Sequence, residues 1–135
     1  MDAVTVQDTL IYIMVSVSAV DREMEEAEML RIGNIVKTLP VFEGYGSERL
    51  VNAAKVCRDI LQEDEGLETI LGFAARLPRN LQETAYVLGA EIAAADRAVK
   101  AEEVRLLQML RNRLAMDKLT CAALERAAQA RHQTG

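Results

Sequence analysis

Tryptophan is absent from this chain of 135 residues, and proline, cysteine and histidine are scarce, with two, two and one copies respectively. Seven glycines add few further breaks. A chain so poor in helix breakers, and rich in alanine, leucine and glutamate, is typical of helices joined by short connections. Its length suits a single domain with one core. We therefore expect an all-α single domain spanning residues 1–135.

The residues of familiar catalytic sites are also few. His132, the one histidine, lies near the end of the sequence, where we expect an exposed tail residue rather than a base or a ligand. The sequence contains no glycine-rich phosphate loop, nucleophile elbow or cysteine–histidine pairing. Cys57 and Cys121 lack the close spacing of a zinc or redox motif, so we predict two buried free thiols. These absences predict a protein that is not an enzyme.

Basic residues are outnumbered, with 16 lysines and arginines against 21 aspartates and glutamates and a net charge of -5. A nucleic-acid-binding surface needs the opposite balance, so we expect no nucleic-acid partner. The apolar run at residues 10–20 is shorter than the roughly 20 residues of a membrane span, and no basic leader precedes it. We expect no membrane span and no targeting segment, and therefore a cytoplasmic protein.

Two stretches of the chain resemble each other when the sequence is shifted by 75 positions. The shift aligns SAVDREMEEAEMLRI, starting at Ser18, with AAADRAVKAEEVRLL, starting at Ala93. The identical pairs are Ala19 with Ala94, Asp21 with Asp96, Arg22 with Arg97, and Glu28 with Glu103. Apolar residues recur three, eleven and fourteen positions after each aspartate, which is helical spacing after a short turn. The pattern predicts an internal repeat at about residues 10–38 and 85–113, each copy forming a helix-turn-helix unit.

The first segment of the repeat is ambiguous by itself, because its β-branched residues alternate partly with serine as in a strand. Its counterpart in the second copy is rich in alanine and helix-prone, so we predict a helix for both. Each is apolar on nearly all sides and should lie in the middle of the fold. Ser16 and Ser18 are expected to bond back to the preceding helical turn.

Further helices are expected outside the repeat. The predicted segments run from Ser47, as N-cap, to about Glu63, from Leu67 to about Arg76, from Pro78 onward, and after Asp117 as N-cap. The last helix is expected to bury one face, made of Leu119, Ala123, Leu124, Ala127 and Ala128. The sequence thus predicts a bundle of about seven helices with two pseudo-symmetric helix-turn-helix halves.

The acidic turns of the repeat first suggest an EF-hand calcium loop. That loop requires glycine at its sixth position and glutamate at its twelfth. Counted from Asp21, these positions hold Glu26 and Ile32; counted from Asp96, they hold Ala101 and Leu107. Both copies therefore exclude an EF-hand.

The same turns resemble those of the TerB-like family of tellurite-resistance proteins, which are small all-helical domains. The resemblance is carried by AVDREMEEAEMLRI and AADRAVKAEEVRLL, and in length and helix order it covers most of the chain. It implies a non-enzymatic bacterial protein of tellurite or metal stress responses, with membrane-linked partners. The residues that it implies as ligands of a divalent cation are Asp21, Glu28, Asp96 and Glu103. Arg22 and Arg97 stand where the family commonly has glycine.

The residues themselves leave two other roles open for these acids. A glutamate seven positions after a turn aspartate lies about one turn into the next helix, where it can accept hydrogen bonds from exposed backbone N–H groups and complement the helix dipole. An exposed acidic face could instead dock a protein partner, cytosolic or membrane-associated, without bound metal. Glu23, Glu25 and Glu26 have no acidic counterparts in the second copy, and we expect them to form a solvated face.

Overall fold

The computed structural model describes residues 4–19, 24–95 and 100–135. Across these ranges the chain forms seven α-helices and one short 3-10 helix, without any strand. The helices are α1 (Val6–Ala19), α2 (Glu26–Thr38), α3 (Ser47–Leu61), α4 (Gly66–Ala75), α5 (Arg79–Ala95), α6 (Ala101–Leu114) and α7 (Lys118–Arg131), with η1 (Pro40–Phe42) as the 3-10 helix. The predicted all-α bundle of about seven helices is therefore confirmed.

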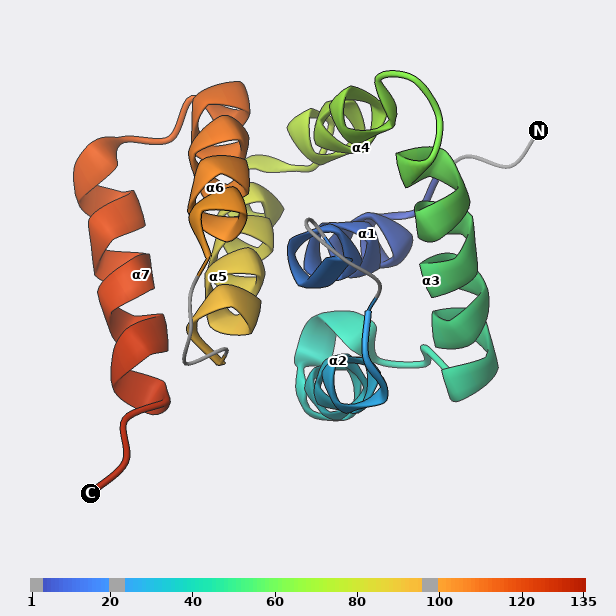
Figure 1. Cartoon of the computed structure of the whole chain (residues 1–135), viewed down its shortest axis with the longest axis horizontal. Helices are drawn as coiled ribbons and strands as arrows, with labels where there is room; N and C mark the ends of the chain where they lie inside the picture. Colours follow the sequence, from blue (N-terminus) through green and yellow to red (C-terminus); the bar gives the residue numbers. More distant parts are fainter. Residues whose placement is uncertain (1–3, 20–23, 96–99) are drawn as a thin grey trace.

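Helix α1 lies in the middle of the bundle (Figure 1). It contacts α2, α3, α4, α5 and α6, and every residue from Thr9 to Ser18 is buried. Burying β-branched side chains on all sides stabilises the helix by more than their weak helix propensity costs. Tertiary packing therefore makes a helix of a segment whose alternation partly suggests a strand.

Helix α5 is the second central helix and packs on both α1 and α7. Gly89 permits this approach, because a Cβ atom built there would lie 3.2 Å from Leu107 Cδ2 and 3.5 Å from Ile13 Cγ2. The absence of a side chain lets α1, α5 and α6 come close together without overpacking.

The second helices of the two repeat copies begin at equivalent positions. Helix α2 begins at Glu26 and α6 at Ala101, which is the same shift of 75 positions that aligns the sequences. Helix α2 packs against α1, and α6 packs against α5. The outer helices differ between the halves: α3 packs against α1, whereas α7 packs against α5 on the side away from α1 (Figure 1).

The predicted helix starts are correct to within a residue. Asp117 caps α7 as expected, since its Oδ2 accepts the backbone N–H of Thr120 at 2.9 Å. Ser47 is the first residue of α3 rather than its N-cap, which is Gly46. Pro78 directly precedes α5, which begins at Arg79.

The predicted buried face of α7 is partly wrong. Leu119 is 82% exposed, and Ala123 and Ala127 also face solvent. The buried or half-buried positions of the helix and its C-cap are Thr120, Cys121, Leu124, Glu125, Ala128 and His132. Helix α7 packs chiefly on α5, and polar contacts from Glu125 and Arg131 to α5 fix its rotation. A count of apolar residues could not foresee those contacts.

None of the helices in the described ranges is both long enough and apolar enough to cross a membrane.

Candidate functional site

The four predicted metal ligands divide into two groups. Asp21 and Asp96 lie outside the residues that the structure describes. Glu28 and Glu103 lie in the first turns of α2 and α6, where both occupy the third helical position. The sequence repeat therefore places a carboxylate at the same point of two corresponding helices.

Each of these glutamates caps the start of its own helix. Oε1 of Glu28 accepts the backbone N–H of Glu25 at 3.0 Å, and Oε1 of Glu103 accepts that of Lys100 at 3.0 Å. This bond is the half of a capping box in which the side chain at the third position satisfies an N–H that has no partner within the helix. The negative charge also complements the positive end of the helix dipole.

The two glutamates differ in burial. Glu103 is only 4% exposed, whereas Glu28 is half-buried. A charged group loses much hydration when it is buried, so hydrogen bonds or ionic contacts must compensate for the loss at Glu103 more than at Glu28. We expect the second copy to depend more strongly on its capping glutamate.

No cluster of three metal-binding side chains occurs among the described residues. A buried hydroxyl does lie close to the first acidic turn in sequence. Ser18, three residues before Asp21, is 3% exposed, and within the described ranges its Oγ has no hydrogen-bond partner. The predicted bond from Ser18 back to the preceding turn is therefore absent there. The second copy has Ala93 at this position and so lacks the hydroxyl.

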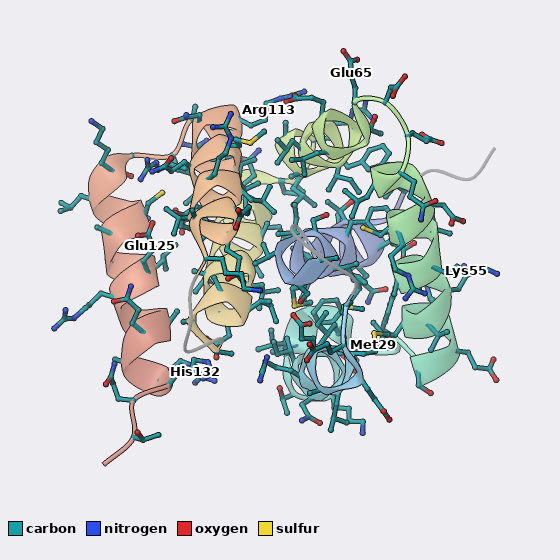
Figure 2. All side chains as sticks on the ribbon, in the orientation of Figure 1. Met29, Lys55, Glu65, Arg113, Glu125 and His132 are labelled. Atoms are coloured by element: carbon teal, nitrogen blue, oxygen red, sulfur yellow. The ribbon has the colours of Figure 1, made fainter. Side chains whose placement is uncertain are left out.

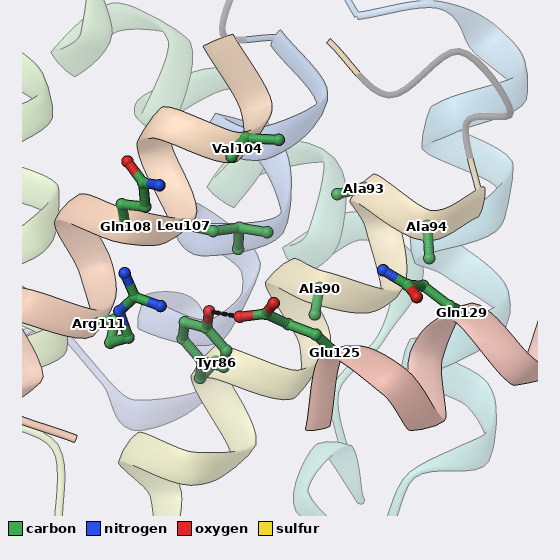
Figure 3. Close-up of a pocket in the computed structure, with 10 residues that line it drawn as sticks. All are labelled: Tyr86, Ala90, Ala93, Ala94, Val104, Leu107, Gln108, Arg111, Glu125 and Gln129. Atoms are coloured by element: carbon green, nitrogen blue, oxygen red, sulfur yellow. Dashed lines mark hydrogen bonds between the residues drawn. The ribbon is translucent and has the colours of Figure 1, made fainter. Parts of the chain in front are cut away.

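A cavity of about 140 Å³ lies between α5, α6 and α7 (Figure 3). Its apolar lining consists of Ala90, Ala93 and Ala94 from α5 together with Val104 and Leu107 from α6. Its polar lining consists of Tyr86, Gln108, Arg111, Glu125 and Gln129. The small alanine side chains on α5 leave the space that α7 does not fill.

Tyr86 connects two walls of this cavity. Its hydroxyl donates a hydrogen bond to Oε2 of Glu125 on α7. Burial raises the pKa of the Tyr86 hydroxyl, and the bond to the carboxylate raises it further. The positive charge of Arg111 lowers the same pKa, so the hydroxyl lies near both the guanidinium of Arg111 and the carboxylate of Glu125. Figure 3 shows the hydroxyl between the guanidinium of Arg111 and the carboxylate of Glu125.

A second polar cluster fastens the end of α7 to α5. Nε of Arg131 donates to both carboxylate oxygens of Glu91, at 3.0 and 3.1 Å. Nε2 of His132 lies 2.9 Å from Oε1 of the same buried glutamate, and its side chain points from the end of α7 toward α5 (Figure 2). His132 is therefore half-buried and in contact with the core rather than the exposed tail residue that we expected.

Both cysteines are buried and free, as predicted. Sγ of Cys57 donates to the backbone oxygen of Tyr12 at 3.5 Å and lies 3.7 Å from Oγ of Ser16. Burial raises the pKa of the Cys57 thiol to about 11. The thiol therefore stays protonated and poorly nucleophilic near neutral pH.

Two of these features were not predicted from the sequence. Glu91 gave a signal, because a charged residue within the apolar segment AYVLGAEIAAA must find a partner if the helix is central. The sequence holds no comparable signal for Arg111 and Glu125, since charged residues in amphipathic helices usually face solvent. Only the placement of α7 brings these two residues to one cavity.

Comparison of the chain with protein-family models, with curated proteins and with solved structures finds no match.

Proposed function

We propose that this chain is a non-enzymatic, cytoplasmic domain of bacterial tellurite or metal stress responses, as its resemblance to the TerB-like family implies. In this proposal Asp21 and Glu28 bind a divalent cation at the first acidic turn, and Asp96 and Glu103 form the equivalent pair at the second. The supporting observation is that the same hydrogen bond fixes a carboxylate at the start of both α2 and α6. Two related cation sites would need such a repeated placement.

Capping a helix and binding a cation are compatible for one glutamate. An ionised carboxylate has about four lone-pair sites, so a side chain that accepts one backbone N–H can also coordinate a metal. Hard cations such as calcium and magnesium prefer carboxylate, hydroxyl and carbonyl oxygens. Ser18 and the additional acids Glu25 and Glu26 favour the first turn over the second as the stronger site, because they add an oxygen donor and negative charge.

A second function, docking of a protein partner without bound metal, is favoured by a separate observation. Helix α7 exposes Leu119, Ala123 and Ala127 along its outer side. An apolar stripe on the outside of a helix is a common protein-binding surface. This function needs neither acidic turn, so loss of metal binding would leave it intact.

Calorimetric titration with calcium, magnesium, manganese and zinc tests the metal function. We expect at least one ion to bind, and Asp21→Asn and Glu28→Gln each to weaken that binding by about tenfold or more, as expected for a lost charge-assisted contact. Glutamine at the third helical position still accepts the N–H of Glu25, so Glu28→Gln removes the charge while keeping the cap. Asp96→Asn reports on the second turn in the same way.

The matched control is Glu63→Gln, which removes an exposed acid beyond the end of α3. Absence of heat with all four ions would exclude the metal function, and binding that is equal in every variant would show that the site lies elsewhere. A fall in melting temperature in the aspartate variants, with no change in metal binding, would identify the turn acids as structural only.

A further inference from the structure

The cavity between α5, α6 and α7 combines a small apolar space with two opposite charges, and the proposed cation sites do not involve it. Its volume of about 140 Å³ is below the roughly 300–1,000 Å³ of pockets that hold drug-sized ligands. A nucleotide or another large cofactor is therefore excluded. The space suits a ligand of only a few carbon, nitrogen and oxygen atoms.

The apolar side of the cavity favours an aliphatic group. Ala90 and Ala93 line it from α5, and Leu107 lines it from α6. Val104 lies at its edge and is 44% exposed, so apolar surface continues from the cavity toward solvent. A short branched hydrocarbon chain would cover this surface and exclude water from it.

The polar side of the cavity holds a cation and an anion that do not pair with each other. Arg111 is half-buried, and among the described residues its guanidinium makes no hydrogen bond or ion pair. Glu125 is oriented by the hydroxyl of Tyr86, which is seen between the two charged groups in Figure 3. The guanidinium can therefore accept a carboxylate in its bidentate geometry, while Glu125 can accept an ammonium group.

We propose that this cavity binds a free α-amino acid with an aliphatic side chain. The ligand's carboxylate would contact Arg111, its ammonium group would contact Glu125, and its side chain would lie against Ala90 and Ala93. A simple carboxylic acid would meet the negative charge of Glu125, and a simple amine would meet the positive charge of Arg111. A zwitterion satisfies both charges at once, which gives specificity by repulsion of the other two ligand classes.

Titration of the full chain with three ligands of matched shape tests this assignment by NMR or calorimetry. The ligands are L-leucine, 4-methylpentanoate, which lacks the ammonium group, and 3-methylbutylamine, which lacks the carboxylate. We expect L-leucine to bind at least about tenfold more tightly than either analogue, because each analogue loses one charge-assisted contact. Resonances of Tyr86 and Ala90 should shift on addition of L-leucine.

Two variants and a control locate the site. Arg111→Gln and Glu125→Gln should each weaken L-leucine binding by about tenfold or more. Glutamine at position 125 retains an oxygen that can accept the Tyr86 hydroxyl, so the contact between α5 and α7 is kept. Arg113→Gln is the control, since Arg113 lies on the same helix but pairs with Glu68 on α4. Lack of L-leucine binding, equal binding of 4-methylpentanoate, or an equal loss in Arg113→Gln would each overturn the proposal.

Discussion

The two halves of the molecule share a plan but differ in the helix that covers each of them. In the first half, α3 lies on α1, where the neutral groups of Cys57, Tyr12 and Ser16 meet in the core, and its charged contact, from Arg49 to Asp8, lies at the first turn of α1. In the second half, α7 lies on α5 and brings charged side chains to it, with Glu125 on Tyr86 and Arg131 on Glu91. The repeated part of the chain therefore supplies the scaffold, and the outer helices make the halves chemically different.

This difference indicates where new properties arise in a duplicated fold. The starts of α2 and α6 keep the same glutamate bond to the backbone, because an unsatisfied helix N-terminus is costly in either half. The surfaces facing the outer helices are free of that constraint. A neutral core contact formed in one half, and a cavity with two charges formed in the other.

The largest expected difference between the halves concerns repeat-equivalent core positions. Leu110 on α6 is 1% exposed, whereas its counterpart on α2, Ile35, is only half-buried. We expect Leu110→Ala to lower the free energy of unfolding by about 2–5 kcal/mol, and Ile35→Ala to lower it by clearly less, because a half-buried site leaves a smaller cavity. Urea denaturation measures both. Equal losses would show that the halves are packed alike.

Raising the pH should lower the free energy of unfolding through deprotonation of Cys57, which lies in the first half. The thiol has a pKa of about 11 in the folded chain and 9.0 as its ordinary value, so the folded state binds the proton more tightly. The stabilisation that the folded state gains from binding this proton is fully present below pH 9. It is lost progressively as the pH rises from 9 through 11. The loss is on the order of 2–3 kcal/mol. We expect wild type to lose more stability than Cys57→Ala between pH 8.5 and 11.

Urea denaturation across that pH range provides the measurement, and the difference between the two proteins removes the contribution of tyrosines and lysines that titrate in both. Cys121→Ala is the matched variant in the second half, where burial also raises the pKa of the thiol. If wild type and Cys57→Ala lose stability in parallel, the buried thiol does not govern the alkaline response.

The smallest expected effect concerns the two capping glutamates. Glu28→Ala and Glu103→Ala should each lower the free energy of unfolding by about 0.5–2 kcal/mol, as for the loss of other helix caps. The buried Glu103 should lie toward the upper end of this range and Glu28 toward the lower. Replacement by glutamine should restore most of the stability, because the amide oxygen still accepts the backbone N–H. A glutamine variant as unstable as the alanine variant would mean that charge, rather than capping, matters.

Periodicity, breakers and the internal repeat were sufficient to predict the helices. The comparison of the ambiguous first segment with its alanine-rich counterpart correctly gave a helix at α1, and Asp117 correctly marked the start of α7. The contacts of α7 were not predictable, because they depend on its rotation. Leu119, Ala123 and Ala127 of the predicted buried face therefore lie toward solvent, and His132 reaches a buried glutamate.

The candidate sites likewise divide into residues that the sequence could predict and residues that only the packing of the helices brings together. Glu28 and Glu103 were found because they repeat, and the structure places them equivalently; their role in metal binding stays a prediction. Arg111 and Glu125 come from different helices with no repeat between them. Only the fold brings them to one cavity, and no local pattern in the sequence reports such an approach.

The central position of α1 also affects how the chain is made. Ribosomes synthesise α1 before all the helices that cover it, and α1 contacts both α5 and α6. Its apolar surface stays partly uncovered until the chain has been extended through Leu114. During that interval the nascent chain displays the kind of surface that chaperones bind and that promotes aggregation. Helix α1, which lies at the centre of the finished domain, is thus partly exposed during most of its synthesis and needs protection then.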